Sequence, residues 1–518
     1  MHPLEHMISK SVSILSSLIV FFEAVLGYGQ IEPRLQGIDA ELNKILSISK
    51  APGLAVAIVE GDKIIYAKGF GYRDYDNKFP MNANTVMPVG STTKAFTCAL
   101  LGRLRDEGKL AFTDSPIKHI SQLRFYRHEL NTNITIKDLM THQTGIPRHD
   151  ESWYLFPSHD KDSLVQRVQY QEPYTGLRQE FHYNNFMLML QGVISERITG
   201  SSWEANINNY FLKPLDMKRS NTSISELKNS TNRAIGYELQ HDTLIQKVDY
   251  FDLAGIGPAG SINSSAKEMA NWLKVWLNKG VYQGKQILSE SYVIEAMSSQ
   301  VVTSASLPEK ESPDMHLSNY GYGWFISSYR GHYRVQHEGN IDGFSANVSF
   351  FPSDSLGIVV LTNQGASSVT SMVRNSIADR MLKIEPTDWV QDFLLEKEKN
   401  EKERNKIKEI ATVNKKDNFE HSNKPISYTG SYQNKGYGTF KIFEEKDSLF
   451  AQFKLKKYYL KQSDTAVFTP FELAGLKLED SGLPVFHFQH KSERKKQVLS
   501  LKIRLEESLQ QPITFKKL

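Results

Sequence analysis

A serine and a lysine stand three residues apart at the start of an apolar stretch, in Pro88-Val89-Gly90-Ser91-Thr92-Thr93-Lys94. In the first turns of a helix, this spacing puts both side chains on one face and within reach of each other. The free N–H groups and positive potential of a helix N-terminus favour an alkoxide or an oxyanion. A desolvated lysine could be the base that the Ser91 hydroxyl needs. The pair alone is weak evidence, because surface helices carry the same spacing by chance.

A tyrosine and an asparagine form a second motif, Phe181-His182-Tyr183-Asn184-Asn185-Phe186, just before another apolar helix. Beside a cationic lysine, the phenol pKa of Tyr183 is expected to fall, so that Tyr183 could take the proton of Ser91 or of a deacylating water. Taken alone, a tyrosine such as Tyr183 is more often a residue that caps a core.

The third motif is Gln336-His337-Glu338-Gly339-Asn340, which stands immediately before a predicted strand at Val348. Gly339 would let a substrate backbone lie close to the strand, and the next N–H, on Asn340, could point at the reacting carbonyl oxygen. His337 by itself is more often an ordinary polar residue than a catalytic one.

Together, the three motifs resemble in order and spacing those of the class C β-lactamases and their relatives, namely low-molecular-weight penicillin-binding proteins, D-aminopeptidases and family VIII esterases. The likeness covers roughly residues 40 to 385. Supporting stretches are Asp138-Leu139-Met140-Thr141-His142-Gln143-Thr144-Gly145-Ile146-Pro147, Leu212-Lys213-Pro214-Leu215-Asp216-Met217, Gly257-Pro258-Ala259-Gly260 and Tyr320-Gly321-Tyr322-Gly323-Trp324.

The resemblance implies a role for each motif. Ser91 would be the nucleophile, with the acid and base work given to Lys94 and Tyr183, and His337 would join this catalytic set. Asn185 would orient Lys94 and the substrate amide. The N–H groups of Ser91 and Asn340, beside Gly339, would form the oxyanion hole. Which of Lys94 and Tyr183 is the base stays open at this point.

The third motif departs from the Lys-Thr-Gly of dedicated β-lactamases, since this chain has His337-Glu338-Gly339. A weaker cation and an added acid argue against tight binding of a β-lactam carboxylate. We therefore expect a serine hydrolase that acts through an acyl-enzyme on a small peptide or amide, including D-amino-acid-containing ones, or on a short acyl ester. The alternative is a non-catalytic sensor or binding protein of the penicillin-binding type.

Strand-like segments lie at both ends of residues 31–388, around a helical middle. The apolar run 53–59 and the segment 63–69 predict a hairpin, and 348–350 and 357–361 predict further strands. This order predicts an α/β domain with an antiparallel sheet flanked by helices and a helical subdomain.

Two further regions follow this domain. Residues 389–424 are dense in Lys and Glu and predict a charged helical linker. In 425–518, alternating segments at 438–442, 449–453, 485–488 and 498–503 predict a small antiparallel β-barrel. This barrel resembles the lipocalin-like domain behind some family peptidases that act on D-amino-acid substrates, although a stabilising or oligomerising module would have the same pattern.

The first 29 residues resemble a signal peptide. An apolar run from Ile14 to Leu26, interrupted by Glu23, precedes the small-x-small triplet Gly27-Tyr28-Gly29. The run is short for a membrane span, so we expect a periplasmic or secreted protein that contacts a membrane only if the segment stays uncleaved. A buried N-terminal helix is the alternative. Cys98 is the only cysteine, so no intramolecular disulfide can form.

The composition and the motifs limit the kinds of binding partner that we expect. A net charge of +4 over 518 residues is too dilute to indicate nucleic-acid binding. The histidines form no HExxH-like ligand cluster, and no glycine-rich phosphate loop is present, so no metal and no cofactor is expected. The expected partner is a small-molecule or short-peptide substrate, selected by loops such as 149–162 and 302–317, and homo-oligomer formation is left open.

Overall fold

The computed structural model describes residues 32–240, 243–305, 307, 317–413, 428–464, 466–474, 477–491 and 497–518. The predicted signal peptide, 1–29, lies outside the described residues, and so do residues 414–424 of the predicted linker. In the described part of the chain, no helix has the length and apolar character needed to cross a membrane.

A nine-stranded antiparallel sheet forms the centre of the described structure, in the order β10-β11-β12-β13-β14-β15-β1-β2-β3. It joins strands from both ends of the domain, because β1 (Gly53–Glu60) pairs with β2 (Lys63–Asp74) on one side and with β15 (Leu356–Thr362) on the other. The predicted fold class is confirmed. The other strands are β3 (Phe79–Pro80), β10 (Val301–Ala305), β11 (Leu317–Tyr320), β12 (Phe325–Tyr329), β13 (His332–Ile341) and β14 (Phe344–Phe351).

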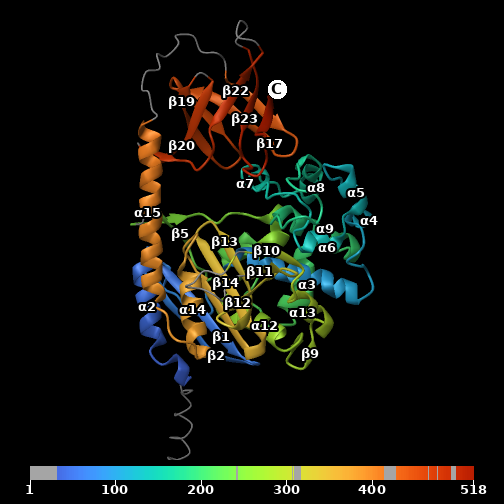
Figure 1. The fold of residues 1–518 in the computed structure, drawn as a ribbon, viewed down its shortest axis with the longest axis vertical. Helices are drawn as coiled ribbons and strands as arrows, with labels where there is room; N and C mark the ends of the chain where they lie inside the picture. The colour runs from blue at the N-terminus through green and yellow to red at the C-terminus, as the bar shows by residue number, and fades with distance from the viewer. Residues whose placement is uncertain are drawn as a thin grey trace, which may run out of the picture.

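Strand β1 is apolar from Gly53 to Val59 because helices cover both faces of the sheet (Figure 1). Leu54, Val56 and Ile58 pack with α2 (Ile38–Ser49) and α14 (Val369–Met381). The alternate residues, Ala55, Ala57 and Val59, belong to a second and larger core that includes α12 (Ala266–Leu277), α3 (Thr93–Asp106) and α9 (Asn185–Thr199). The functional motifs lie around this second core.

The helical middle of the domain packs beside the sheet, with α3 against α9. Two 3₁₀ turns matter for the site: η2 (Gly90–Thr92), which leads into α3, and η5 (Ala254–Ala259). The shorter helices are α4 (Pro116–His119), α5 (His128–Asn133), α6 (Ile136–Met140), α7 (Glu151–Tyr154), α8 (Lys161–Arg167), α10 (Trp203–Ile207), α11 (Ile224–Asn229) and α13 (Glu290–Ala296), and three small pairs are β4 (Met87–Pro88) with β7 (Asn263–Ser264), β5 (Gly236–Gln240) with β6 (Leu244–Val248), and β8 (Val281–Tyr282) with β9 (Lys285–Gln286).

The long helix α15 (Trp389–Val413) leads from the sheet domain to the C-terminal barrel, which lies over α7 in Figure 1. Because β19 pairs with β20, eight of the described strands close into a barrel, and β21 is added beside β20. This confirms the expected barrel, whose core is largely aromatic. Its strands are β16 (Gly430–Asn434), β17 (Gly438–Glu445), β18 (Ser448–Gln452), β19 (Lys457–Asp464), β20 (Val467–Ala474), β21 (Lys477–Asp480), β22 (Phe486–His490), β23 (Val498–Ile503) and β24 (Ile513–Lys517).

Candidate functional site

Ser91 and Lys94 face each other where η2 passes into α3. Lys94 Nζ lies 2.8 Å from Ser91 Oγ and donates a hydrogen bond of 2.8 Å to the carbonyl of Ala259 at the end of η5. The lysine side chain is fully buried, and this burial, helped by the nearby charge of Arg148, lowers its pKa well below the ordinary 10.5. A neutral amine directs a lone pair as well as its hydrogens, so Lys94 can accept the Ser91 proton.

Tyr183 lies beside this pair in the loop before α9. Asn184 begins the helix, because its side chain accepts a hydrogen bond from the Phe186 N–H. The Tyr183 ring centroid is 4.8 Å from Lys94 Nζ, and its hydroxyl shares a hydrogen bond with Ser91. Burial raises the pKa of the phenol, against the lowering expected from the sequence, so Tyr183 keeps its proton at neutral pH.

The third motif brings β13 against the backbone of η2. A Cβ added to Gly339 would lie 2.0 Å from the carbonyl oxygen of Val89 and 3.0 Å from the Ser91 nitrogen. Gly90, at φ +52°, meets the same strand, since a Cβ there would lie 3.0 Å from the Asn340 nitrogen. Glycine at both positions therefore lets the Ser91 and Asn340 N–H groups come close together, as a pair of oxyanion donors requires.

His337 lies next to Tyr183, with ring centroids 6.2 Å apart. Its Nδ1–H donates a 2.6 Å hydrogen bond to the Glu338 carbonyl, which leaves Nε2 to accept from the Tyr320 hydroxyl at 3.3 Å. Burial lowers the pKa of His337 to about 3, so the ring is neutral. Both ring nitrogens thus serve contacts within the protein, and the ring supports Tyr183 by packing.

Arg148 and Asp150 are site residues that no sequence motif indicated. The amide of Asn185 was expected to orient Lys94, but its Nδ2 donates to Asp150 Oδ1 at 2.9 Å. Arg148 Nε donates to the other carboxylate oxygen at 2.6 Å, and its guanidinium carbon lies 4.9 Å from the Tyr183 ring centroid. The prediction that the loop 149–162 shapes the pocket was the one sequence signal for this region.

Two cavities share Ser91, Arg148 and Asn340 as lining residues, so the nucleophile opens onto both. One has a volume of about 280 Å³ and the other of about 460 Å³. The smaller one has an apolar side and an acid, Glu151, whose pKa burial raises to about 7. Its apolar side consists of Trp153, Leu253, Ile256 and Ile341.

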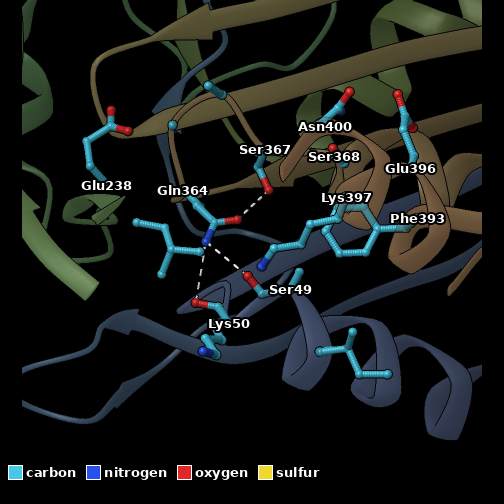
Figure 2. Close-up of a pocket in the computed structure, with 14 residues that line it drawn as sticks. Ser49, Lys50, Glu238, Gln364, Ser367, Ser368, Phe393, Glu396, Lys397 and Asn400 are labelled. Atoms are coloured by element: carbon cyan, nitrogen blue, oxygen red, sulfur yellow. Dashed lines mark hydrogen bonds between the residues drawn. The ribbon is translucent and has the colours of Figure 1, made fainter. Parts of the chain in front are cut away.

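A cavity of about 300 Å³ lies on another part of the molecule, between α2, α15 and the loop after β15 (Figure 2). Gln364 crosses its floor, with Nε2 donating to the carbonyls of Ser49 and Lys50 and Oε1 accepting from the Ser367 hydroxyl. The Ser49 hydroxyl donates back into its own helix, to Ile45. The hydroxyls of Ser49 and Ser367 thus hold local structure, whereas Ser91 faces a buried amine.

Metal chemistry was not expected from the sequence. Across the residues that the structure describes, no group of three or more His, Cys, Asp or Glu side chains could hold a metal ion. Cys98 is buried in α3 with its Sγ 3.3 Å from Gln191 Oε1.

Comparison with known proteins identifies relatives of this chain by sequence and by fold. The family model described as Beta-lactamase matches residues 38–378. Protein flp of Staphylococcus aureus (strain MW2) is 29% identical over 342 residues, 66% of this chain and 65% of that protein, so the chain spans less than two thirds of this relative.

Two solved structures resemble the chain in fold. The octameric penicillin-binding protein homologue from Pyrococcus abyssi has a TM-score of 0.62 and 20% identity, covering 93% of this chain and 100% of that one. A D-stereospecific amidohydrolase from Streptomyces sp. has a TM-score of 0.54 and 19% identity, covering 67% of this chain and 99% of that one.

Proposed function

Because the chain belongs to the beta-lactamase family, a family of serine hydrolases, we propose that it cleaves small amides or short peptides through an acyl-enzyme on Ser91. The observation that carries this proposal is the fully buried Lys94 amine, 2.8 Å from Ser91 Oγ. A protein that only binds a ligand has no need to bury a lysine of lowered pKa against a serine.

In the proposed acylation step, neutral Lys94 takes the proton of Ser91 as Oγ bonds to the substrate carbonyl carbon. The negative charge that develops on the carbonyl oxygen is stabilised by the N–H groups of Ser91 and Asn340. Lys94 was one of two candidate bases. The lowered pKa of its ammonium and the raised pKa of the Tyr183 phenol favour Lys94 for this role.

Tyr183 is then the general acid that protonates the leaving group. Its hydroxyl gives a proton to the departing amine nitrogen as the C–N bond breaks, and the proton held by Lys94 replaces it. In deacylation, a water molecule gives a proton to Lys94 and Tyr183 and its oxygen bonds to the acyl carbon. The bond between that carbon and Ser91 Oγ then breaks, Oγ takes the proton back from the pair, and the product leaves as a carboxylic acid. His337 stays neutral through these steps because its pKa is about 3.

The two cavities support a short peptide or amide as substrate. Arg148 presents a guanidinium to both cavities, and Glu151 lines the smaller one. A guanidinium and an acid with a pKa of about 7, near an apolar wall, suit a small substrate with polar ends and an apolar side chain. The name of the D-stereospecific amidohydrolase, a structural neighbour, points to the same class.

The experiment compares wild type with Ser91→Ala on D-alanine and L-alanine p-nitroanilides, a p-nitrophenyl ester series and nitrocefin. We expect Ser91-dependent cleavage of an anilide, with the D form preferred. Ester cleavage alone would move the protein to the esterase branch, and nitrocefin cleavage alone would make it a β-lactamase. Equal rates for wild type and Ser91→Ala on every substrate would support the non-catalytic binding protein instead.

A further inference from the structure

The segment from Arg148 to Phe156 touches the catalytic cluster with one side and the C-terminal barrel with the other. Toward the cluster, Asp150 binds Asn185, and Arg148 lies over the Tyr183 ring. Toward the barrel, Phe156 is an integral member of the aromatic core, 5.4 Å from Phe453 by ring centroids. One short segment thus belongs to both domains.

His149, between the two site residues, is held by the barrel. Its N–H donates to Glu506 Oε2 at 2.8 Å, and its Nε2–H donates to the Glu172 carbonyl at 3.2 Å. Nδ1 is left to accept from the Tyr437 hydroxyl at 2.9 Å, and burial lowers the pKa of the ring, which keeps it neutral. Glu506 follows β23 and Tyr437 precedes β17, so two barrel loops meet at this one residue.

The backbone of His149 has a φ of +47°, in the left-handed region that residues other than glycine rarely adopt. Such a conformation persists where surrounding contacts enforce it. Here two of those contacts come from the barrel, and a third, from the Ser152 hydroxyl to the Gly436 carbonyl at 2.6 Å, fixes the next turn. The turn at His149 aims the flanking side chains, Arg148 and Asp150, at the catalytic cluster.

We propose that the barrel is a working part of the hydrolase site, in which Tyr437 and Glu506 are positioning residues that hold the 148–156 segment so that Arg148 and Asp150 face Tyr183 and Asn185. This inference rests on the proposed hydrolase function. It assigns the barrel a role in catalysis and in substrate selection, because the same segment supplies Glu151 and Trp153 to the smaller cavity.

The charges of the segment also bear on the base. Arg148 is the largest charged influence that lowers the pKa of Lys94, and Asp150 acts in the opposite direction. Cys98, on α3, also acts to raise the pKa of Lys94. The rings of His142 and His337 lie close enough to Lys94 for its charge to lower their own pKa values. Displacing the segment would weaken the lowering by Arg148 and the smaller raising by Asp150, and it would let water reach Lys94. Because the Arg148 effect is the larger of the two and burial is the largest of all, the net result is a higher pKa of the ammonium.

The test uses the full-length protein in three variants. Glu506→Ala removes the acceptor for the His149 N–H, Glu506→Gln keeps an acceptor oxygen, and Tyr437→Phe removes the hydroxyl but keeps the ring. Glu445→Ala is the matched control, since it removes an exposed ion pair with Lys457 elsewhere on the barrel. For each, kcat and KM are measured across pH, with hydrogen exchange of residues 148–156.

For Glu506→Ala and Tyr437→Phe we expect faster hydrogen exchange in 148–156 and a fall in kcat of about 10- to 100-fold. The rise of kcat/KM with pH on the acid side of the profile should also move to higher pH. Glu506→Gln restores most of the activity, and Glu445→Ala behaves as wild type. Unchanged exchange, or faster exchange with wild-type kcat and acid limb, would overturn the inference.

The two proposals fail separately. If wild type shows no Ser91-dependent turnover, the proposed function fails, and the exchange experiment still decides whether the barrel holds the segment. If wild type is active and the Glu506 and Tyr437 variants match it, the hydrolase stands and the barrel has no part in its catalysis.

Discussion

The smaller of the two cavities beside Ser91 has two walls that are held in place in different ways. One wall, with Gly90, Ser91 and Asn340, rests on the packed core of the sheet domain, where α3 and β13 are fixed by buried neighbours. The other wall, the 148–156 segment, is held by hydrogen bonds and aromatic contacts to the barrel. The difference separates two tasks: the core wall sets the chemistry, and the barrel-held wall sets how substrate and proton are presented to it.

Replacing the base should have the largest effect on turnover. Lys94→Ala is expected to lower kcat/KM by about 10³-fold or more, because Ser91 loses its proton acceptor. Lys109→Ala, which removes an exposed lysine beyond the end of α3, serves as the control. Progress curves with the best substrate measure both, and a Lys94→Ala variant that kept more than a tenth of wild-type activity would remove Lys94 from the mechanism.

A methyl group on β13 should have the next largest effect. The added Cβ of Gly339→Ala would meet the Val89 carbonyl at 2.0 Å and push the strand away from Ser91. Loss of one oxyanion donor costs about 10²- to 10³-fold in kcat. Tyr333→Ala, on an exposed position of the same strand, should change kcat little. Wild-type kcat in Gly339→Ala would mean that β13 supplies no donor.

The pH dependence sharpens the choice of base. Neutral Lys94 is the active form and its pKa is lowered, so kcat/KM should rise about tenfold per pH unit and level off well below pH 10.5. Measurement from pH 5 to 10 locates the limb. It should stay in place in His337→Gln, because the pKa of His337 is about 3. A flat profile, or a rise centred above pH 10, would exclude Lys94 as the base.

Loosening the barrel-held wall should have the smallest effect on turnover and a clear effect on stability. Phe156→Ala empties a buried site among barrel aromatics, which costs about 3–5 kcal/mol, and we expect kcat to fall only about tenfold. Calorimetry detects the barrel transition, and Phe443→Ala, a partly exposed aromatic on β17, is the control. Equal loss of stability in both variants would show that Phe156 does not link the domains.

The sequence predicted the core of the fold because its signals are local. The apolar run at β1 and the alternation in β17, β18, β22 and β23 indicate strands without knowledge of their partners. Strands β16, β19, β20, β21 and β24 were not predicted from the pattern. Their place in the barrel comes from pairing with neighbours, which periodicity does not encode.

The same contrast between local and distant signals holds for the site. Ser91, Lys94, Tyr183 and Gly339 could be named from their motifs and the family that these resemble, and the structure brings them together. Arg148 and Asp150 could not, because their direction depends on the contact of His149 with Glu506, 357 positions later in the chain. The lowering predicted for the pKa of Tyr183 was reversed because burial has a larger effect than a lysine that is itself neutral.

The pairing of β1 with β15 has a consequence for the order in which the chain folds. Leu54 lies opposite Thr362, so a strand made early in synthesis finds one of its partners only when some three hundred further residues exist. Until then, the backbone N–H and C=O groups along one edge of a largely apolar strand lack their partners, and contacts so distant in sequence form slowly. A ribosome-bound chain that ends at residue 355 should therefore stay sensitive to protease, whereas a chain extended through β15 should become resistant. The native sheet would then form only when its last central strand has left the ribosome.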